Sequence, residues 1–184
     1  PGMPPEEIEA RIAALLAQRG RQRGPNRRWL LDRIAARGIP VASHDDWHAE
    51  EIAENARDGI TISEFPVSVA AAEAARAHGM EIIGGAPNLV RGGSHSGNVA
   101  VADLVAAGLV DAFASDYVPP ALLEAAWKAW RQQGIPLPAA VAMITDRPAR
   151  MAGLADRGRL APGLRGDLVR VAAFEGTPVA RQVW

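Results

Sequence analysis

Residues 60–88 read ITISEFPVSVAAAEAARAHGMEIIGGAPN, and this stretch decides the fold class. A short apolar run ends at Glu64, an alanine-rich segment over about 67–77 ends at His78-Gly79, and a second apolar run leads into Asn88. Apolar runs of this length predict buried strands, and the segment between them has the length and composition of a helix. The stretch therefore predicts a strand–helix–strand unit whose parallel strands are joined by a right-handed crossover.

The same alternation continues on both sides of this stretch. IPVAS at 39–43 ends at His44-Asp45-Asp46, VDAFA at 110–114 ends at Ser115-Asp116, and the four predicted strands start 21, 21 and 29 residues apart. The pattern predicts an α/β fold with a parallel sheet whose carboxyl strand ends share one rim, where ligands bind. The remaining helices are expected at about 48–57, 98–107, 119–133 and 136–144.

The two ends of the chain differ from this pattern. At the N-terminal end, residues 5–19 and 26–37 predict two helices joined by a basic turn at Arg19–Arg28, which is either a solvated turn or a patch that steers an anionic substrate. At the C-terminal end, β-like runs at 167–172 and 178–184 follow a segment rich in Pro and Gly, and they predict a small β appendage.

Composition limits the class of protein. The 184 residues carry a net charge of −1, with 48% apolar and 22% charged residues, which excludes a disordered chain and does not support nucleic-acid binding through bulk charge. Because there is no run of about 18 apolar residues, we expect no membrane association. The chain has no cysteine, so it forms neither disulfides nor thiolate metal sites, and this fits the reducing cytoplasm where we expect it to act.

Polar residues at three of the predicted strand ends are candidates for chemistry. His44 could bind a divalent metal through a ring nitrogen, while Asp45 and Asp46 also suit the N-cap of the next helix. Asp116 could bind metal or accept a proton from a metal-bound water, or it could simply form a turn. Glu64 could position a ligand or metal, or be an exposed carboxylate at the end of its strand.

The glycine-rich stretch GAPNLVRGGSHSGN at 84–97, closed by Asn98, is the most informative part of the sequence. Its glycines allow the backbone to approach a ligand closely, and it leads into a helix N-terminus, which favours anions. No GK[ST] follows, so it is not a Walker loop. We interpret it as a phosphate- or polyphosphate-binding loop, with a flexible surface loop as the alternative. Its candidate donors are Asn88, Arg91, Ser94, His95, Ser96 and Asn98.

Two sets of motifs resemble a known family. TDRPAR at 145–150 with GLADRGRLAPGLRGDLVRV at 153–171 resembles the C-terminal signature of the amidohydrolase superfamily. Within it, VASHDD, ISEFPVS, the glycine-rich stretch and ASDYVP resemble, in this order, the PhnM-type diphosphatase family of the carbon–phosphorus lyase pathway. That family hydrolyses α-D-ribose 1-methylphosphonate 5-triphosphate, a phosphorylated sugar, to diphosphate and the 5-phosphate. The resemblance covers about residues 26–184.

The resemblance implies both an architecture and roles for residues. Residues 1–152 would form part of a (β/α)8 TIM barrel, about strands five to eight, and residues 153–184 would form a segment of a β-sandwich. His44 matches the strand-five metal ligand, and Asp116 the strand-eight aspartate that contacts a divalent metal, zinc or manganese, and handles the proton of the attacking water. Glu64 lies at the strand-six position. The glycine-rich loop would hold the triphosphate, with Arg91 and His95 stabilising the departing diphosphate.

The chain lacks other parts of the superfamily's metal site. It contains no His-x-His pair, and its single lysine, Lys128, lies in a predicted helix after the last strand. We therefore expect the second half of a longer enzyme, inactive without its N-terminal half, whose unpaired strand edges favour self-association. The rival interpretations are another amidohydrolase, such as a cyclic amidase or deacetylase, and a non-catalytic α/β phosphate-binding module.

Overall fold

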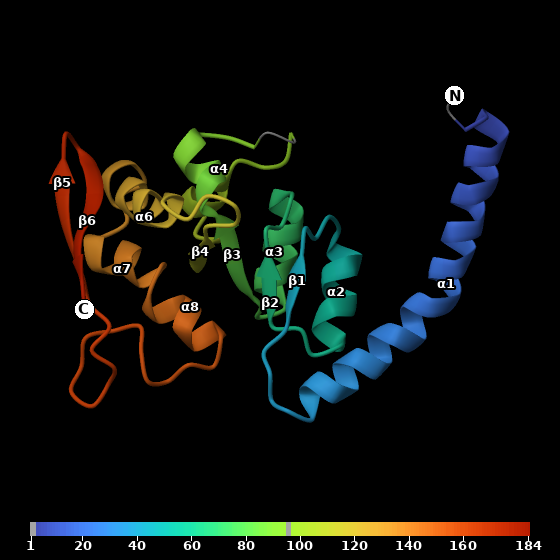
Figure 1. Ribbon diagram of the computed structural model, residues 1–184, viewed down its shortest axis with the longest axis horizontal. Coiled ribbons are helices and arrows are strands. Elements are labelled where there is room, and N and C mark those ends of the chain that lie inside the picture. The colour runs from blue at the N-terminus through green and yellow to red at the C-terminus, as the bar shows by residue number, and fades with distance from the viewer. Residues whose placement is uncertain (1–2, 95–96) are drawn as a thin grey trace. The chain divides into compact units, whose positions relative to one another are not determined.

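Four parallel strands form a sheet in which each strand pairs with the next one along the chain (Figure 1). This computed structural model describes residues 3–94 and 97–184. The predicted α/β class with a parallel sheet is confirmed. The strands of the sheet are β1 (Ala42–His44), β2 (Ile62–Glu64), β3 (Glu81–Gly85) and β4 (Ala112–Ala114). The helices that follow them are α2 (Ala49–Arg57), α3 (Val69–Ala77), α4 (Ala86–Arg91), α5 (Val101–Ala106), α6 (Ala121–Gln132), α7 (Leu137–Ala142) and α8 (Asp146–Met151).

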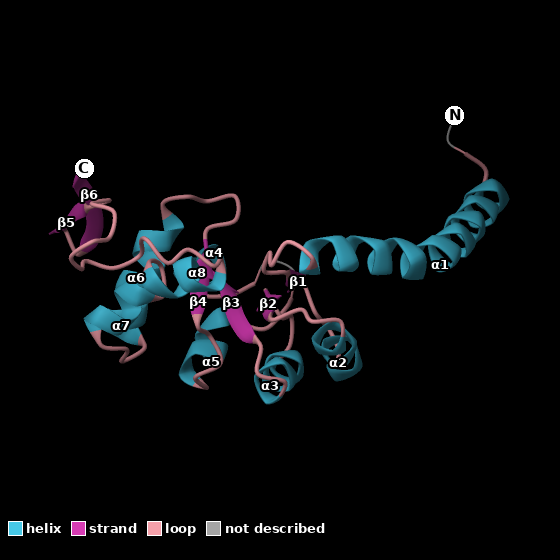
Figure 2. Cartoon of the chain, turned by 90° about the horizontal axis from the view of Figure 1, so that it is seen from below, coloured by secondary structure: helices cyan, strands magenta, loops and turns pink. Residues whose placement is uncertain are grey.

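One face of the sheet is covered by α2, α3 and α5, which lie in a row in Figure 2. The core here is made of fully buried apolar side chains such as Ile52 of α2, Ala72 of α3 and Ile82 of β3. The packing is tight at Gly84, where an added Cβ would lie 3.0 Å from Val101 Cγ1. Alanine on α3 and glycine in β3 therefore let helices approach the sheet closely, as the crossover pattern in the sequence requires.

The opposite face of the sheet is covered in part by α8. Met151 is buried together with Ile62 of β2 and Ala112 of β4. Arg147 at the start of the same helix donates a hydrogen bond of 3.1 Å from Nη1 to the backbone oxygen of Asp111, which precedes β4. The segment after the last strand is thus attached to the sheet itself.

Two short helices, α4 and α8, lie where the sequence predicted a glycine-rich loop and a segment rich in Pro and Gly. For α4 the local signals are present in the sequence: Pro87 suits the first turn of a helix, and Gly92, with φ of 88°, ends it in the left-handed conformation. The glycine-rich stretch is therefore a helix followed by a loop, and Arg91 is the last residue of that helix.

The two helices predicted at 5–19 and 26–37 are wrong as separate elements. Residues 5–35 form a single helix, α1 (Pro5–Ala35), which includes Pro25. A proline removes one helical hydrogen bond and bends a helix without necessarily ending it, and α1 is bent in Figure 1. The expected basic turn at Arg19–Arg28 is instead helical.

The chain divides into two compact units, Pro1–Ile39, which contains α1, and Pro40–Trp184, which contains the sheet. The boundary predicted at residue 152 stays a prediction. Within the second unit, the predicted C-terminal β runs form an antiparallel hairpin of β5 (Val169–Phe174) and β6 (Thr177–Val183).

Within residues 3–94 and 97–184, no helix has the length and apolar character needed to cross a membrane.

The segment between α8 and the hairpin folds back onto α8. Asp146 accepts hydrogen bonds from Arg150 Nε at 3.1 Å and Arg159 Nη1 at 3.2 Å. Partial burial raises the pKa of Asp146, but the hydrogen bonds from the two arginines outweigh it and leave that pKa below its ordinary value. Gly158, with φ of 94°, lies so close that an added Cβ would be 2.9 Å from Ala149 Cβ.

We predict that Gly158→Ala lowers the free energy of unfolding by about 3 kcal/mol, since the methyl group adds a steric clash to the cost of a left-handed backbone. The matched control is Gly163→Ala. Gly163 also has a positive φ, of 85°, but an added Cβ there meets no atom within 4 Å. The control should lose only about 1 kcal/mol. Urea unfolding of both variants measures the difference, and equal losses would contradict the packing argument.

Candidate functional site

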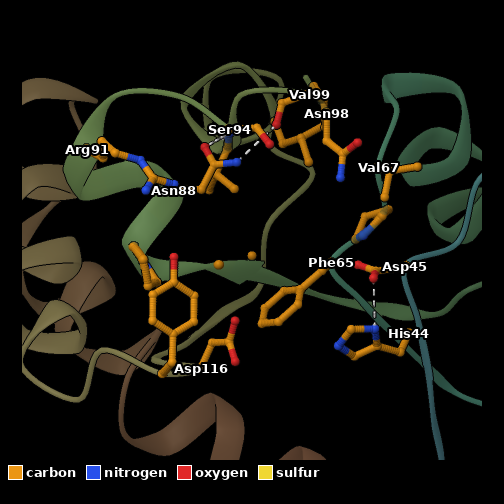
Figure 3. Close-up of a pocket in the computed structure, with 17 residues that line it drawn as sticks. His44, Asp45, Phe65, Val67, Asn88, Arg91, Ser94, Asn98, Val99 and Asp116 are labelled. Atoms are coloured by element: carbon orange, nitrogen blue, oxygen red, sulfur yellow. Dashed lines mark hydrogen bonds and ion pairs between the residues drawn. The ribbon is translucent and has the colours of Figure 1, made fainter. Parts of the chain in front are cut away.

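A hollow of about 250 Å³ lies at the carboxyl ends of the parallel strands (Figure 3). It receives side chains from the ends of β1, β2 and β4 and from the α4 region that follows β3. This is the rim at which the sequence pattern placed the ligand site. The predicted site residues that line it are His44, Asn88, Arg91, Ser94, Asn98 and Asp116. His95 and Ser96 lie outside the described residues.

Three residues of the hollow that follow strands have a left-handed backbone. The φ angles are 56° at Asp45, 57° at Phe65 and 48° at Asp116, and none of the three is glycine. Such conformations are costly for residues with a side chain and gather at functional sites. The hydrogen bonds between strands continue one residue past the ends of β1 and β2. Asp45 N donates to Glu64 O at 3.0 Å, and Phe65 N donates to Ile83 O at 2.9 Å.

The imidazole of His44 lies between two carboxylates. Its Nδ1 is 3.3 Å from Asp45 Oδ2, and its Nε2 is 3.8 Å from Glu64 Oε2. The ring of Phe65 meets it edge-on, with the ring centroids 5.3 Å apart. Glu64, a predicted site residue, is not among the described residues that line the hollow, but it contacts His44 from the neighbouring strand. The structure thus brings the candidate residues of the first two strands together.

Asp46 has a different role from the N-cap that the sequence suggested. Helix α2 has His48 at its N-cap without a side-chain bond, so the capping interpretation of Asp45 and Asp46 is wrong. Only 1% of Asp46 is exposed, and its Oδ2 accepts hydrogen bonds of 2.6 Å from both Ser43 Oγ and Ser63 Oγ. Its Oδ1 accepts one of 2.9 Å from Asn55 Nδ2. The carboxylate is drawn inward because three side-chain donors from β1, β2 and α2 surround it.

Asn88 is engaged by the backbone of the loop that follows α4. Its Nδ2 donates to Val99 O at 3.2 Å, and its Oδ1 accepts from Val101 N at 3.0 Å. The amide therefore joins α4 to the far end of the loop, whose described parts are residues 92–94 and 97–100. A hydrogen bond from Val99 N to Val67 O, 3.0 Å long, attaches the same loop to the segment after β2.

The hollow has a cationic side and an acidic side. In Figure 3, Arg91 reaches toward the hollow from α4, and Ser94 and Asn98 lie along the same upper edge. Asp116 and His44 lie along the opposite edge. An anion bound against Arg91 would therefore face a carboxylate and an imidazole across the hollow.

The acidic side does not by itself make a metal centre. Across the described part of the chain there is no group of three or more His, Cys, Asp or Glu side chains that could hold a metal ion. His44 and Asp116 would supply two ligands, whereas hydrolytic metal sites usually have three or more protein ligands. The residues present do not fit a complete divalent-metal site.

Sequence reasoning missed several residues that shape the hollow. Phe65, Val67 and Tyr117 all line it, and each lies within a few residues of a predicted strand end. Their positions could have been found by extending the strand-end rule to the residues that follow the polar one. The burial of the Asp46 carboxylate could not be predicted from the neighbouring sequence, because its hydrogen-bond donors come from three separate elements.

Comparison with known proteins gives one family match and one relative in sequence. The model of the amidohydrolase family matches residues 8–181. The alpha-D-ribose 1-methylphosphonate 5-triphosphate diphosphatase of Escherichia coli (strain K12) is 47% identical over 166 residues, which are 89% of this chain and 42% of that enzyme. The chain therefore spans less than half the length of this relative.

Solved structures give a likeness of fold. A crystal structure of an uncharacterised protein matches 85% of this chain and 49% of its own, with a TM-score of 0.58 and 19% identity. A crystal structure of a prolidase complexed with N-methylphosphonate-L-proline matches 85% of this chain and 48% of its own, with a TM-score of 0.57 and 20% identity.

We predict that Asp46→Asn lowers the free energy of unfolding by about 3 kcal/mol, because an amide nitrogen in place of an oxygen leaves buried donors without an acceptor. Asp45→Asn is the matched control: its side chain is 56% exposed, and asparagine tolerates its left-handed backbone. The control should change stability by no more than about 0.5 kcal/mol. Thermal and urea unfolding measure both, and similar losses would refute a special role for Asp46.

Proposed function

This chain belongs to the amidohydrolase family, and from that premise we propose that it forms the phosphate-binding side of a diphosphatase site. The proposed substrate is α-D-ribose 1-methylphosphonate 5-triphosphate, on which the E. coli relative is named to act. The single observation that carries the proposal is the hollow at the strand ends, with Arg91 on one side and Asp116 on the other.

The proposed architecture is the second half of a (β/α)8 barrel. Strands β1 to β4 would be barrel strands five to eight, and the β5–β6 hairpin would belong to a β-sandwich. Two features support this: the strands are parallel and consecutive in the sheet, and α2, α3 and α5 cover a single face, as the outer helices of a barrel do.

The cationic side of the hollow suits a polyphosphate. The Arg91 guanidinium can donate a planar pair of hydrogen bonds to phosphate oxygens. Ser94 and Asn98 add a hydroxyl and an amide on the same edge. His95 and Ser96 lie between them in the sequence, and their proposed contacts with the substrate stay predictions.

The acidic side suits the attacking water. In the proposed hydrolysis, water attacks the phosphorus atom nearest the ribose. The bond from this phosphorus to the oxygen that bridges to the second phosphate breaks, and diphosphate leaves. The Asp116 carboxylate would accept the proton that the water loses. Arg91 would stabilise the negative charge that grows on the departing diphosphate. Because the two residues lie on opposite edges of the hollow, they would act on different parts of the substrate.

Members of the amidohydrolase family generally use a divalent metal, which activates water and neutralises phosphate charge. The described residues supply at most His44 and Asp116 for such an ion, with Glu64 beside His44. We therefore propose that the remaining ligands come from an N-terminal segment of the enzyme outside these 184 residues.

We predict that Arg91→Ala, made in the complete enzyme that contains this chain, lowers kcat/KM for diphosphate release by about 100-fold, since a charge-stabilising donor is lost. Arg91→Lys should keep part of the activity, because lysine retains the charge but not the planar fork. Arg57→Ala, an exposed position near the end of α2, is the control and should leave kcat/KM unchanged.

The same assay separates the rival functions. Diphosphate release that is indifferent to Arg91→Ala would remove the proposed role of this residue. Cleavage of a cyclic amide or an N-acetyl group without diphosphate release would replace the diphosphatase by another amidohydrolase activity. Triphosphate binding with no turnover by the complete enzyme would favour a non-catalytic phosphate-binding module.

A second prediction concerns the metal. The 184-residue chain alone, dialysed after exposure to zinc or manganese, should retain well below about one equivalent, because two side-chain ligands hold a metal weakly. Elemental analysis by plasma emission measures the content, and His44→Ala provides the background level. Near-stoichiometric metal in the unaltered chain would show that the 184 residues hold a complete site and would overturn the need for an outside segment.

A further inference from the structure

The only lysine of the chain, Lys128, contacts the helix that carries Arg91. It lies in the middle of α6 and is partly buried. Its Nζ donates hydrogen bonds to two backbone oxygens, Val90 O at 2.8 Å and Leu89 O at 3.2 Å. Both oxygens belong to α4, directly before Arg91. The single lysine ammonium of the sequence is thus placed against the C-terminal end of the helix that borders the hollow.

These backbone oxygens need a donor from elsewhere. The last carbonyl groups of a helix have no partner within it, and α4 has only six residues. Where α4 ends, Gly92 N and Gly93 N both bond to Asn88 O, each at 3.0 Å, and therefore not to the next two oxygens, those of Leu89 and Val90, which Lys128 reaches. A cation at a helix C-terminus is also electrostatically favourable.

The loop after α4 is closed by the same short helix. Asn88 bonds to Val99 O and Val101 N, so the residues just before α5 are attached to α4. The position of α4 therefore sets the position of residues 99–101. Lys128 joins α4 to the longer helix α6, which has twelve residues and a fully buried face at Ala125 and Ala129.

We propose that Lys128 is a positioning residue for anion binding: by holding the end of α4 it fixes the Arg91 backbone and the described parts of the loop, 92–94 and 97–100. It acts through α4 and is not among the residues that line the hollow. The identity of the anion rests on the proposed function, whereas the effect of Lys128 on the loop does not. The two parts are therefore tested by separate measurements on the 184-residue chain.

The first measurement is hydrogen exchange in the unaltered chain, in Lys128→Met and in Lys128→Arg. Methionine has a similar apolar stem and is also a good helix former, but it lacks the ammonium group that donates both hydrogen bonds. We expect the Gly92, Gly93 and Val101 amides to exchange about tenfold faster in Lys128→Met, with the melting temperature nearly unchanged, and to regain protection in Lys128→Arg. Unchanged exchange, or faster exchange spread evenly over the whole chain, would overturn the proposal.

The second measurement is the affinity for inorganic triphosphate by titration calorimetry. Lys128→Met should weaken it about tenfold, and Lys128→Arg should restore most of the loss. Equal affinity in Lys128→Met would overturn the role of Lys128 in anion binding. If the unaltered chain binds no triphosphate, the proposed function loses its support, while the exchange experiment still decides whether Lys128 holds the loop.

Discussion

The buried carboxylate of Asp46 fixes how the first two strands meet, and the candidate site depends on that arrangement. Ser43 and Ser63 are register partners in β1 and β2, and both donate to this carboxylate, while Asn55 brings α2 to it. Neighbouring residues in a strand point to opposite faces, so the next pair, His44 and Glu64, lies on the other face. A slip by one residue would separate the two serines and move His44 away from Glu64.

The same principle organises the rest of the sheet. Ile82 and Ser63, on the face of the sheet turned toward the helices, are fully buried. At the carboxyl ends the chain turns sharply, and it does so through non-glycine residues in the left-handed region, Asp45, Phe65 and Asp116. The helix-facing residues pack the sheet against the helices. The residues in the turns line a single hollow. Alternate residues of the same short strands therefore have different roles: one set packs against the helices, and the other includes the candidate site residues His44 and Glu64.

The sequence was informative where the determinants are local. Apolar runs and their polar ends identified all four parallel strands and the rim that holds His44 and Asp116. It was uninformative where distant contacts decide. The basic stretch RGRQRGPNRR at 19–28 predicted a turn, although residues 5–35 form one helix that includes Pro25. Asn88 reads as a ligand donor in a glycine-rich loop, yet its amide closes that loop. Asp46 reads as a cap, yet donors from three elements turn it inward.

The separation of charge in the hollow has a physical reason that bears on its chemistry. A guanidinium beside a carboxylate forms an ion pair, which would weaken both its attraction for a phosphate and the ability of the carboxylate to accept a proton. Here Arg91 and Asp116 lie on opposite edges, and Phe65 lies between Asp116 and His44 in Figure 3. Arg91 owes its position to α4, and Asp116 to the turn after β4. An anionic substrate with one charged end and one reacting centre would bridge the two edges, so the distance between these elements becomes part of the specificity of the site.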